Sequence, residues 1–228
     1  MSNSGNIKII CTPNTHKPSV SISDQLLPCH SGMDGFFAGY VPGYEPVMFP
    51  PGTAKFLPRG TVLRFQMHYV TTSQDETDQT QLGLYTTPVP PTHVLQTRSA
   101  YNFLFSIPAG APDYQATATY GPFPRAVNLY EMSPHMHLRG SRFKYVAVYP
   151  NNSRETLLSV PFYQFHWQTL YRLAQPKMLP AGTRIECTGA WDNSQQNHHN
   201  PDPSRTVGFG EQTDDEMFIG YFNFAEIP

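Results

Sequence analysis

Alternation of apolar and polar residues is the dominant pattern along the chain, and it predicts β-strands. It is clearest in residues 61–72, TVLRFQMHYVTT, where positions 63, 65, 67 and 69 are apolar or aromatic. Side chains alternate between the two faces of a strand, so the opposite face should present Arg64, Gln66 and His68. The segment is therefore expected to be a strand with one apolar and one polar face.

Similar segments bounded by turn-forming residues predict strands along the rest of the chain. They lie at about 99–107, 115–120, 126–132, 134–138, 142–149, 155–160, 165–174, 182–191 and 216–225. Strands of this number and spacing are typical of a sandwich. The expected fold class is all-β: a jelly-roll-like antiparallel β-sandwich in the C-terminal part, preceded by a partial N-terminal one.

Composition supports a folded β protein. The 228 residues include 23 Pro and 16 Gly, and proline ends helices because it lacks the backbone N–H. The 15 Phe, 13 Tyr and 2 Trp are enough to fill a core, which argues against disorder. Mean hydropathy is -0.41, and no apolar run approaches the roughly 18–20 residues of a spanning helix, so no membrane span is expected.

The chain is expected to have three parts. Residues 1–31 are polar and irregular and read as a poorly specified leader, with one short strand at 7–11. Residues 32–90 are expected to form a partial N-terminal β domain, and residues 91–228 the complete C-terminal sandwich. The proline-rich segment 88–93 marks the expected boundary.

Charge and cysteine content narrow the function further. Lys and Arg number 15 against 17 Asp and Glu, a net charge of -2, and no basic stripe is present, so nucleic acid is not an expected partner. Cys11, Cys29 and Cys187 do not have the spacing of a zinc knuckle. No basic segment followed by an apolar run begins the chain, so no secretory signal is expected in it.

The sharpest chemical signal is the segment SPHMHLRG, residues 133–140. His135 and His137 are two residues apart, so on a strand both imidazoles lie on the same face and can converge on one metal ion. Copper, iron, zinc and nickel all accept imidazole, so the pair alone does not select the metal.

The C-terminal segment FGEQTDDEMFIGYFNF offers two kinds of third ligand. By parity Met217 faces with Ile219 and Tyr221, whereas Glu216 faces with the phenylalanines at 218, 222 and 224. With a carboxylate from Glu216 or Asp215, two histidines form the facial triad of a non-haem Fe(II) dioxygenase. With the Met217 thioether the set is soft and favours copper, particularly Cu(I).

Together these motifs resemble the catalytic domain of the copper type II, ascorbate-dependent monooxygenases, the family of peptidylglycine α-hydroxylating and dopamine β-monooxygenases. SPHMHLRG is similar to the family's HxH strand, and DEMFIGYF, about eighty residues later, to its DEM strand. The resemblance implies that His135, His137 and Met217 hold the copper that binds oxygen. It also implies that Tyr221 lines the substrate cleft.

The resemblance extends upstream to residues 64–69, RFQMHY, which are similar to a QxHY strand of the family's first domain. It implies that His68 is one of three ligands to a second, electron-transferring copper and that Gln66 lines the cleft between the coppers. The family's adjacent His-His pair upstream of this strand has no counterpart here, where His16 and His30 are the only earlier histidines. The second copper site is therefore expected to be incomplete, and the first domain truncated.

Two further departures concern the disulfide and the substrate. Animal members pair a cysteine at the position of Cys187 with one right after the ligand methionine, where this chain has Phe218. Peptide-amidating members carry an arginine two residues before the first ligand histidine, where this chain has Ser133. The resemblance therefore does not imply a carboxylate-terminated peptide as substrate.

Other polar residues are interpreted as structural. Segments 166–168 and 191–193 read as packing at strand ends, and His198-His199 as part of a solvated loop. The acidic cluster at 214–216 is expected either to cap a loop or to orient a histidine.

The leading hypothesis is a copper-dependent monooxygenase that hydroxylates an activated C–H bond of a small-molecule or peptide-like substrate with O2. The resemblance implies up to two copper ions, ascorbate or another one-electron reductant, and a periplasmic or secreted location. A non-catalytic copper-binding β-sandwich and a non-haem Fe(II) dioxygenase remain as alternatives. The sequence leaves the substrate, the electron donor and the oligomeric state open.

Overall fold

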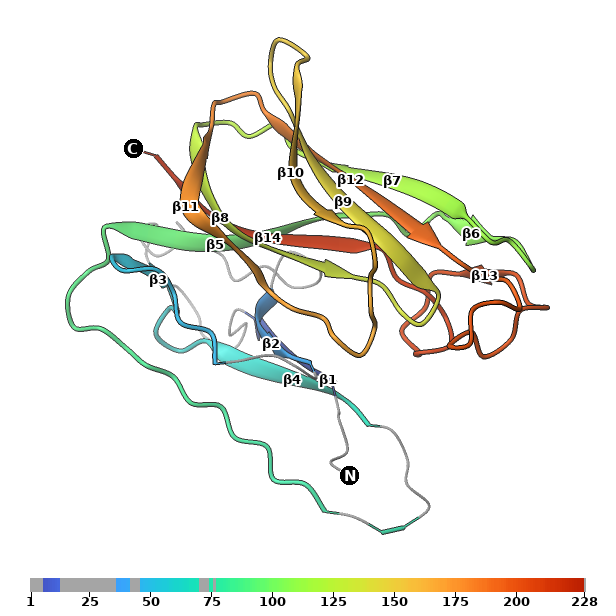
Figure 1. Ribbon diagram of the computed structural model, residues 1–228. Helices are drawn as coiled ribbons and strands as arrows, with labels where there is room; N and C mark the ends of the chain where they lie inside the picture. Colours follow the sequence, from blue (N-terminus) through green and yellow to red (C-terminus); the bar gives the residue numbers. More distant parts are fainter. Residues whose placement is uncertain (1–5, 13–35, 42–45, 70–73, 76, 228) are drawn as a thin grey trace. The chain divides into compact units, whose positions relative to one another are not determined.

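A computed structural model gives the fold, and it describes residues 6–12, 36–41, 46–69, 74–75 and 77–227 (Figure 1). The chain divides into two compact units, residues 1–95 and 96–228. The division falls between Leu95 and Gln96; the domain bounds expected from the sequence stay a prediction. The described residues contain no helix, so the all-β class predicted from the sequence is confirmed.

The first unit contains a small antiparallel sheet with the strand order β2-β1-β4. Its strands are β1 (Asn6–Thr12), β2 (Phe36–Tyr40) and β4 (Val62–His68). A short strand, β3 (Thr53–Lys55), runs parallel to residues 93–95 at the start of β5 (His93–Tyr101). The predicted strand at 7–11 is thus confirmed. The strand predicted at 61–72 is confirmed over 62–68, and residues 70–72 lie outside the described residues.

The apolar face predicted for β4 is only partly packed. Leu63 and Met67 are half-buried, but Phe65 is 41% and Tyr69 58% exposed. Among the described strands of its sheet, β4 lies at the edge, next to β1. The polar face keeps Gln66 and His68 side by side, two residues apart.

The second unit is a jelly roll of two four-stranded antiparallel sheets. One sheet has the order β11-β8-β14-β5 and the other β10-β9-β12-β7. The strands are β7 (Tyr114–Tyr120), β8 (Val127–His135), β9 (Gly140–Val148), β10 (Arg154–Val160), β11 (Tyr171–Leu179), β12 (Arg184–Trp191) and β14 (Ile219–Glu226). Two short strands, β6 (Ser106–Ile107) and β13 (Val207–Gly208), pair with each other near one end. The chain crosses between the sheets repeatedly, and this strand order is that of two interlocked Greek keys.

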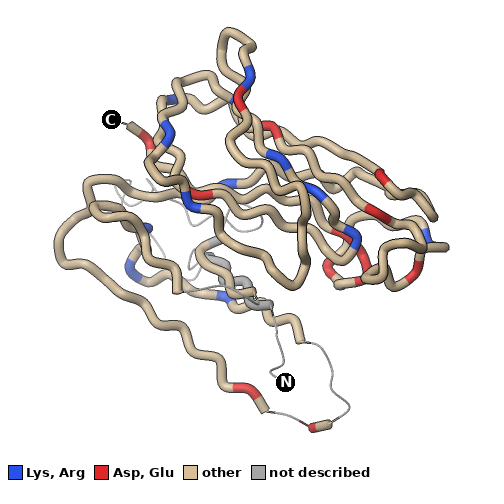
Figure 2. The backbone as a smooth tube through the Cα atoms, in the orientation of Figure 1, with Lys and Arg blue, Asp and Glu red and all other residues tan. Residues whose placement is uncertain are grey.

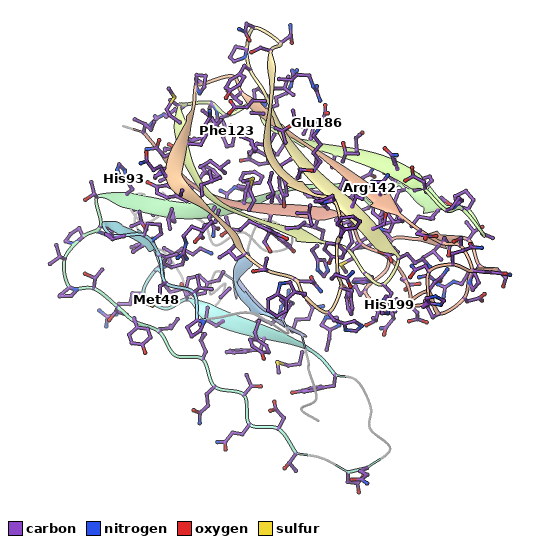
Figure 3. The ribbon with its side chains drawn as sticks, viewed as in Figure 1. Met48, His93, Phe123, Arg142, Glu186 and His199 are labelled. Atoms are coloured by element: carbon purple, nitrogen blue, oxygen red, sulfur yellow. The ribbon has the colours of Figure 1, made fainter. Side chains whose placement is uncertain are left out.

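The core lies between these two sheets and consists mainly of aromatic and aliphatic side chains. Its members include Leu129, Met132, Phe143, Tyr145, Ile185, Trp191, Phe218 and Phe222. Phe123, labelled in Figure 3, packs against the phenylalanines of β14, with ring centroids 6.2 Å from Phe222 and 5.1 Å from Phe224. Cys187 is a free, fully buried thiol, and burial raises its pKa well above the usual value.

Charged residues are sparse and the two signs are interspersed over the second unit (Figure 2). Several form ion pairs, such as Arg142 with Asp113 at 2.6 Å and Lys177 with Glu155 at 2.8 Å. These pairs are solvent-exposed and contribute little to stability. The described residues include no helix long and apolar enough to span a membrane.

Several strand boundaries differ from the predicted ones. The strand predicted at 99–107 is wrong in both bounds: β5 begins at His93 and ends at Tyr101, and β6 is a separate strand of two residues. The strands predicted at 126–132 and 134–138 form one strand, β8, which runs through Pro134. Pairing with β11 stops at Met132, so the missing N–H of Pro134 removes no bond to that neighbour. The predicted start of a strand at 165 is also wrong, because a turn closed by Trp167 N–H donating to the Gln164 carbonyl (3.0 Å) comes first.

Close approach of the two sheets requires glycine at position 220. A Cβ there would lie 2.6 Å from Cys187 Sγ and 3.0 Å from Tyr145 Cε1. We expect Gly220→Ala to lower the free energy of unfolding by about 1–3 kcal/mol, because the core would have to shift. Gly208→Ala is the matched control, since its nearest contact is an ordinary 3.4 Å and its effect should stay within about 0.5 kcal/mol. Chemical denaturation measures both, and equal effects would contradict this account of the packing.

Candidate metal centre

The two histidines of the HxH motif lie together where β8 ends. His135 is the last residue of β8 and is half-buried, and His137 follows in the turn and is 5% exposed. Their ring centroids are 5.3 Å apart, with the ring planes at 83°. Met132 and Met136, of opposite parity, are fully buried in the core, so both histidines belong to the outward face of the sheet.

This separation fits two ligands of one metal ion. A coordinating imidazole nitrogen lies about 2.0–2.1 Å from the ion, which puts the ring centroid about 3 Å away. Two rings on one ion are therefore at most about 6 Å apart. The observed 5.3 Å lies within this limit.

Hydrogen bonds define which ring nitrogen of each histidine carries the proton. His135 Nδ1 lies 2.7 Å from Gln168 Oε1, and the Gln168 amide nitrogen donates to the Phe165 carbonyl at 3.0 Å. His137 Nδ1 lies 3.2 Å from the Asp215 carbonyl oxygen. Both partners are acceptors, so each Nδ1 donates and each lone pair is on Nε2. Metal-binding histidines are usually oriented in this way.

The register of β14 supports the same outward face for Met217. In the β8–β14 pairing Ile219 lies opposite His135 and Tyr221 opposite Ser133. The pairing ends at Ile219, and Met217 comes two residues before the start of β14. Extending the register by two residues would set Met217 opposite His137, so we expect it on the face of Tyr221 and His135, because directly opposed residues project from the same face of a sheet.

Glu216 projects the other way and is fully buried, as its parity predicted. One carboxylate oxygen accepts from His137 N–H at 2.9 Å and Trp191 Nε1–H at 3.0 Å. The other accepts from Arg139 N–H at 2.7 Å. The carboxylate therefore fixes the turn that carries His137 and is engaged by three donors away from the imidazoles.

Arg139 extends this buried network. Its Nε donates to Asn193 Oδ1 at 2.9 Å and one terminal nitrogen donates to the Asp214 carbonyl at 2.9 Å. Burial lowers the pKa of the guanidinium, an effect that the nearby Glu216 opposes. The side chain of Asp215 pairs with Arg205 rather than with a histidine.

The predicted site residues divide between the two units. His135, His137, Met217 and Tyr221 lie in the second unit, and Gln66 and His68 lie on β4 of the first. His16 and His30 fall outside the described residues. Among the residues that the structure describes, no three His, Cys, Asp or Glu side chains gather as metal ligands. The candidate set instead combines two histidines with a methionine.

Sequence reasoning missed the side chains that hold the site in place. The sequence predicted only a packing role for Gln168, Trp191 and Asn193. In the structure Gln168 hydrogen-bonds His135, Trp191 donates to Glu216, and Asn193 accepts from Arg139. For the acidic cluster at 214–216, one predicted role was to orient a histidine. The Asp215 carbonyl accepts from His137 Nδ1, and the Glu216 carboxylate accepts from the His137 backbone N–H. Nothing in the local pattern around Gln168 connects it to His135, which is distant in sequence.

Fold and site together define an all-β jelly roll with a two-histidine cluster where β8 ends. No protein-family model matches the chain, and no curated protein matches it significantly. Among solved structures, the particles of infectious bursal disease virus are similar only at a distant level. The Gx strain structure gives a TM-score of 0.28 at 11% identity, over 100% of this chain and 61% of that one. The VP2 subviral particle gives 0.26 at 11% identity, over 99% and 62%.

TM-scores and sequence identities this low support no inference about the function of this chain. It spans about three fifths of the length of those capsid proteins. The geometry of the candidate metal centre is therefore the basis for a proposed function.

The buried carboxylate makes stability depend on pH. Burial raises the pKa of Glu216 from its ordinary 4.5 to about 7, although the three donors and Arg139 act to lower it. The folded state then holds the proton more tightly than the unfolded state, so the contribution of Glu216 is greatest below pH 4.5 and is lost as the pH rises to about 7.

We therefore expect the metal-free chain to lose stability relative to Glu216→Gln as the pH rises. Between about pH 5 and about pH 7.5 the difference in free energy of unfolding should change by about 2–3 kcal/mol against the wild type. Urea denaturation with a chelator present measures it, and exposed Glu211→Gln is the control. A difference that is constant with pH would contradict a raised pKa.

Proposed function

We propose that the chain binds copper through His135, His137 and Met217 and acts as a copper-dependent monooxygenase on an activated C–H bond. The observation that carries the proposal is the pair of imidazoles 5.3 Å apart, both with Nδ1 bonded to an oxygen acceptor. Extension of the β8–β14 register, which ends at Ile219 opposite His135, supports Met217 as the third ligand. The HxH and DEM motifs in this order support the same assignment.

The donor set fits copper better than iron. Two neutral imidazoles and a thioether form a soft, neutral set that stabilises Cu(I). An Fe(II) triad needs a carboxylate, but Glu216 accepts three hydrogen bonds in the core and Asp215 pairs with Arg205. The structure therefore gives no support to either carboxylate as a ligand.

When bound, copper supplies the one-electron redox chemistry by which O2 is reduced and one oxygen atom is inserted into a C–H bond. The residues of the chain hold and orient it. Gln168 and the Asp215 carbonyl keep both lone pairs on Nε2, and Glu216 holds the backbone of His137. Tyr221, on the same face, is assigned to substrate positioning. Electrons come from ascorbate or another one-electron reductant. His68 is assigned to an incomplete electron-transfer copper site, and Gln66 to the lining of the cleft.

Copper loading of matched variants tests the proposal. We expect Met217→Ala to weaken Cu(I) binding at least tenfold and His135→Ala to weaken it further, because each removes one of three ligands. Met178→Ala is the control, since Met178 is 54% exposed on β11. A competition titration with a Cu(I) chelator gives the affinities. Equal copper retention by all variants would overturn the site.

Oxygen uptake under ascorbate then separates enzyme from binding protein. Free copper also oxidises ascorbate, so desalted protein and copper-free protein must be run together over a panel of candidate substrates. The proposal predicts substrate-dependent uptake by the wild type and none by Met217→Ala. Full copper retention without substrate-dependent uptake would favour the non-catalytic copper-binding protein.

The hydrogen bond from Gln168 gives a prediction that leaves all three ligands in place. We expect Gln168→Leu to lower copper affinity about 10–100-fold, because the His135 ring loses the partner that fixes its orientation. Gln196→Leu, at an exposed loop position, serves as control. Unchanged affinity in Gln168→Leu would show that this bond does not orient a ligand.

A further inference from the structure

Two histidines that the sequence does not connect meet at the surface of the second unit. His166 lies in the loop between β10 and β11, and His199 in the loop between β12 and β13. Their ring centroids are 5.8 Å apart, with the planes at 68°, and both residues are exposed. Figure 3 labels His199 on its loop.

The separation of these rings also fits a shared metal ion. The limit for two imidazoles on one ion is about 6 Å between centroids, and 5.8 Å lies just inside it. Such a value corresponds to a wide angle between the two ligands at the ion. Both rings are exposed, so an ion can reach them from solvent.

The loop that carries His199 is tied to buried structure. The His199 N–H donates to Asn197 Oδ1 at 3.0 Å, and the Asn197 amide donates to the Asp192 carbonyl at 2.8 Å. The amide of Asn200 donates to Asn193 Oδ1 at 3.0 Å, and Asn193 is fully buried. A ligand held in this way loses little conformational entropy when it binds an ion.

Hydrogen bonds also fix the loop that carries His166. The turn over residues 164–167 is closed by a backbone hydrogen bond of 3.0 Å, and Gln168, 4% exposed, donates to the Phe165 carbonyl at 3.0 Å. The Phe165 ring contacts His166 at 5.3 Å and His137 at 5.9 Å between centroids. One aromatic ring therefore separates the exposed pair from the candidate metal centre.

We infer that His166 and His199 form a solvent-facing copper site, distinct from both the His135–His137 centre and the copper site expected at His68. Two imidazoles are the only protein ligands the geometry supplies, because the described residues contain no group of three His, Cys, Asp or Glu that could hold a metal. Copper(II) heads the affinity order of divalent metals for nitrogen ligands, so a two-imidazole site favours it over zinc, nickel or iron. Water completes the coordination. The site stands independently of the function proposed above.

The experiment uses the full chain without an affinity tag, in a His135→Ala, His137→Ala background that removes the first centre. Cu(II) alone is titrated into this protein and into two further variants built on it. The first adds His166→Ala and His199→Ala, and the second adds His198→Ala as an exposed, adjacent control. Bound copper is measured by calorimetry, and the ring proton signals of the histidines are followed by NMR. Circular dichroism confirms that all the variants fold.

The inference predicts that the background protein and the His198→Ala protein bind one more copper equivalent than the protein that lacks His166 and His199. It also predicts that Cu(II) broadens the ring signals of His166 and His199 at lower copper concentrations than that of His198. Equal binding by all three proteins would overturn it. Loss of the equivalent in His198→Ala, with retention in the double variant, would also overturn it and assign the copper to another ligand.

Discussion

The arrangement at the candidate metal centre depends on one buried carboxylate. Glu216 accepts hydrogen bonds from the backbone of His137 and Arg139 and from the indole of Trp191. These bonds join the end of β8, the approach to β14 and the end of β12. Met217 is the next residue along the chain. The bonds that fix Glu216 therefore also restrain the backbone position of Met217. Buried carboxylates need such donors, since an unpaired one is strongly disfavoured in a core.

The jelly roll explains why chemistry can be placed here without weakening the core. Alternation along β8 and β14 sends Met132, Met136, Phe218 and Phe222 into the space between the sheets. The same alternation sends His135 and Tyr221 to the opposite side. Core residues and candidate site residues therefore occupy neighbouring positions on the same strands. The loops after β10 and β12 then supply Gln168 and the exposed histidine pair.

Much of this arrangement could be predicted from the sequence, because it depends on short-range periodicity. The all-β sandwich, the strand at β4, the shared face of His135 and His137, and the grouping of Glu216 with the core phenylalanines all follow from a period of two. The start of β11 could not be predicted, since the aromatic segment 165–170 has a strand-like composition but closes a turn. The contacts of Gln168 with His135 and of His166 with His199 depend on which loops meet in space. The local sequence pattern does not show which loops lie close together in the fold.

X-ray absorption of the Cu(I)-loaded chain shows directly whether Met217 is a copper ligand, because it detects sulfur bound to copper. For a centre built from His135, His137 and Met217 we expect two nitrogen scatterers and one sulfur scatterer in the wild type. The sulfur signal should disappear in Met217→Ala and persist in Met178→Ala. A wild-type spectrum without sulfur, or a sulfur signal that survives the loss of Met217, would contradict a copper centre built from His135, His137 and Met217.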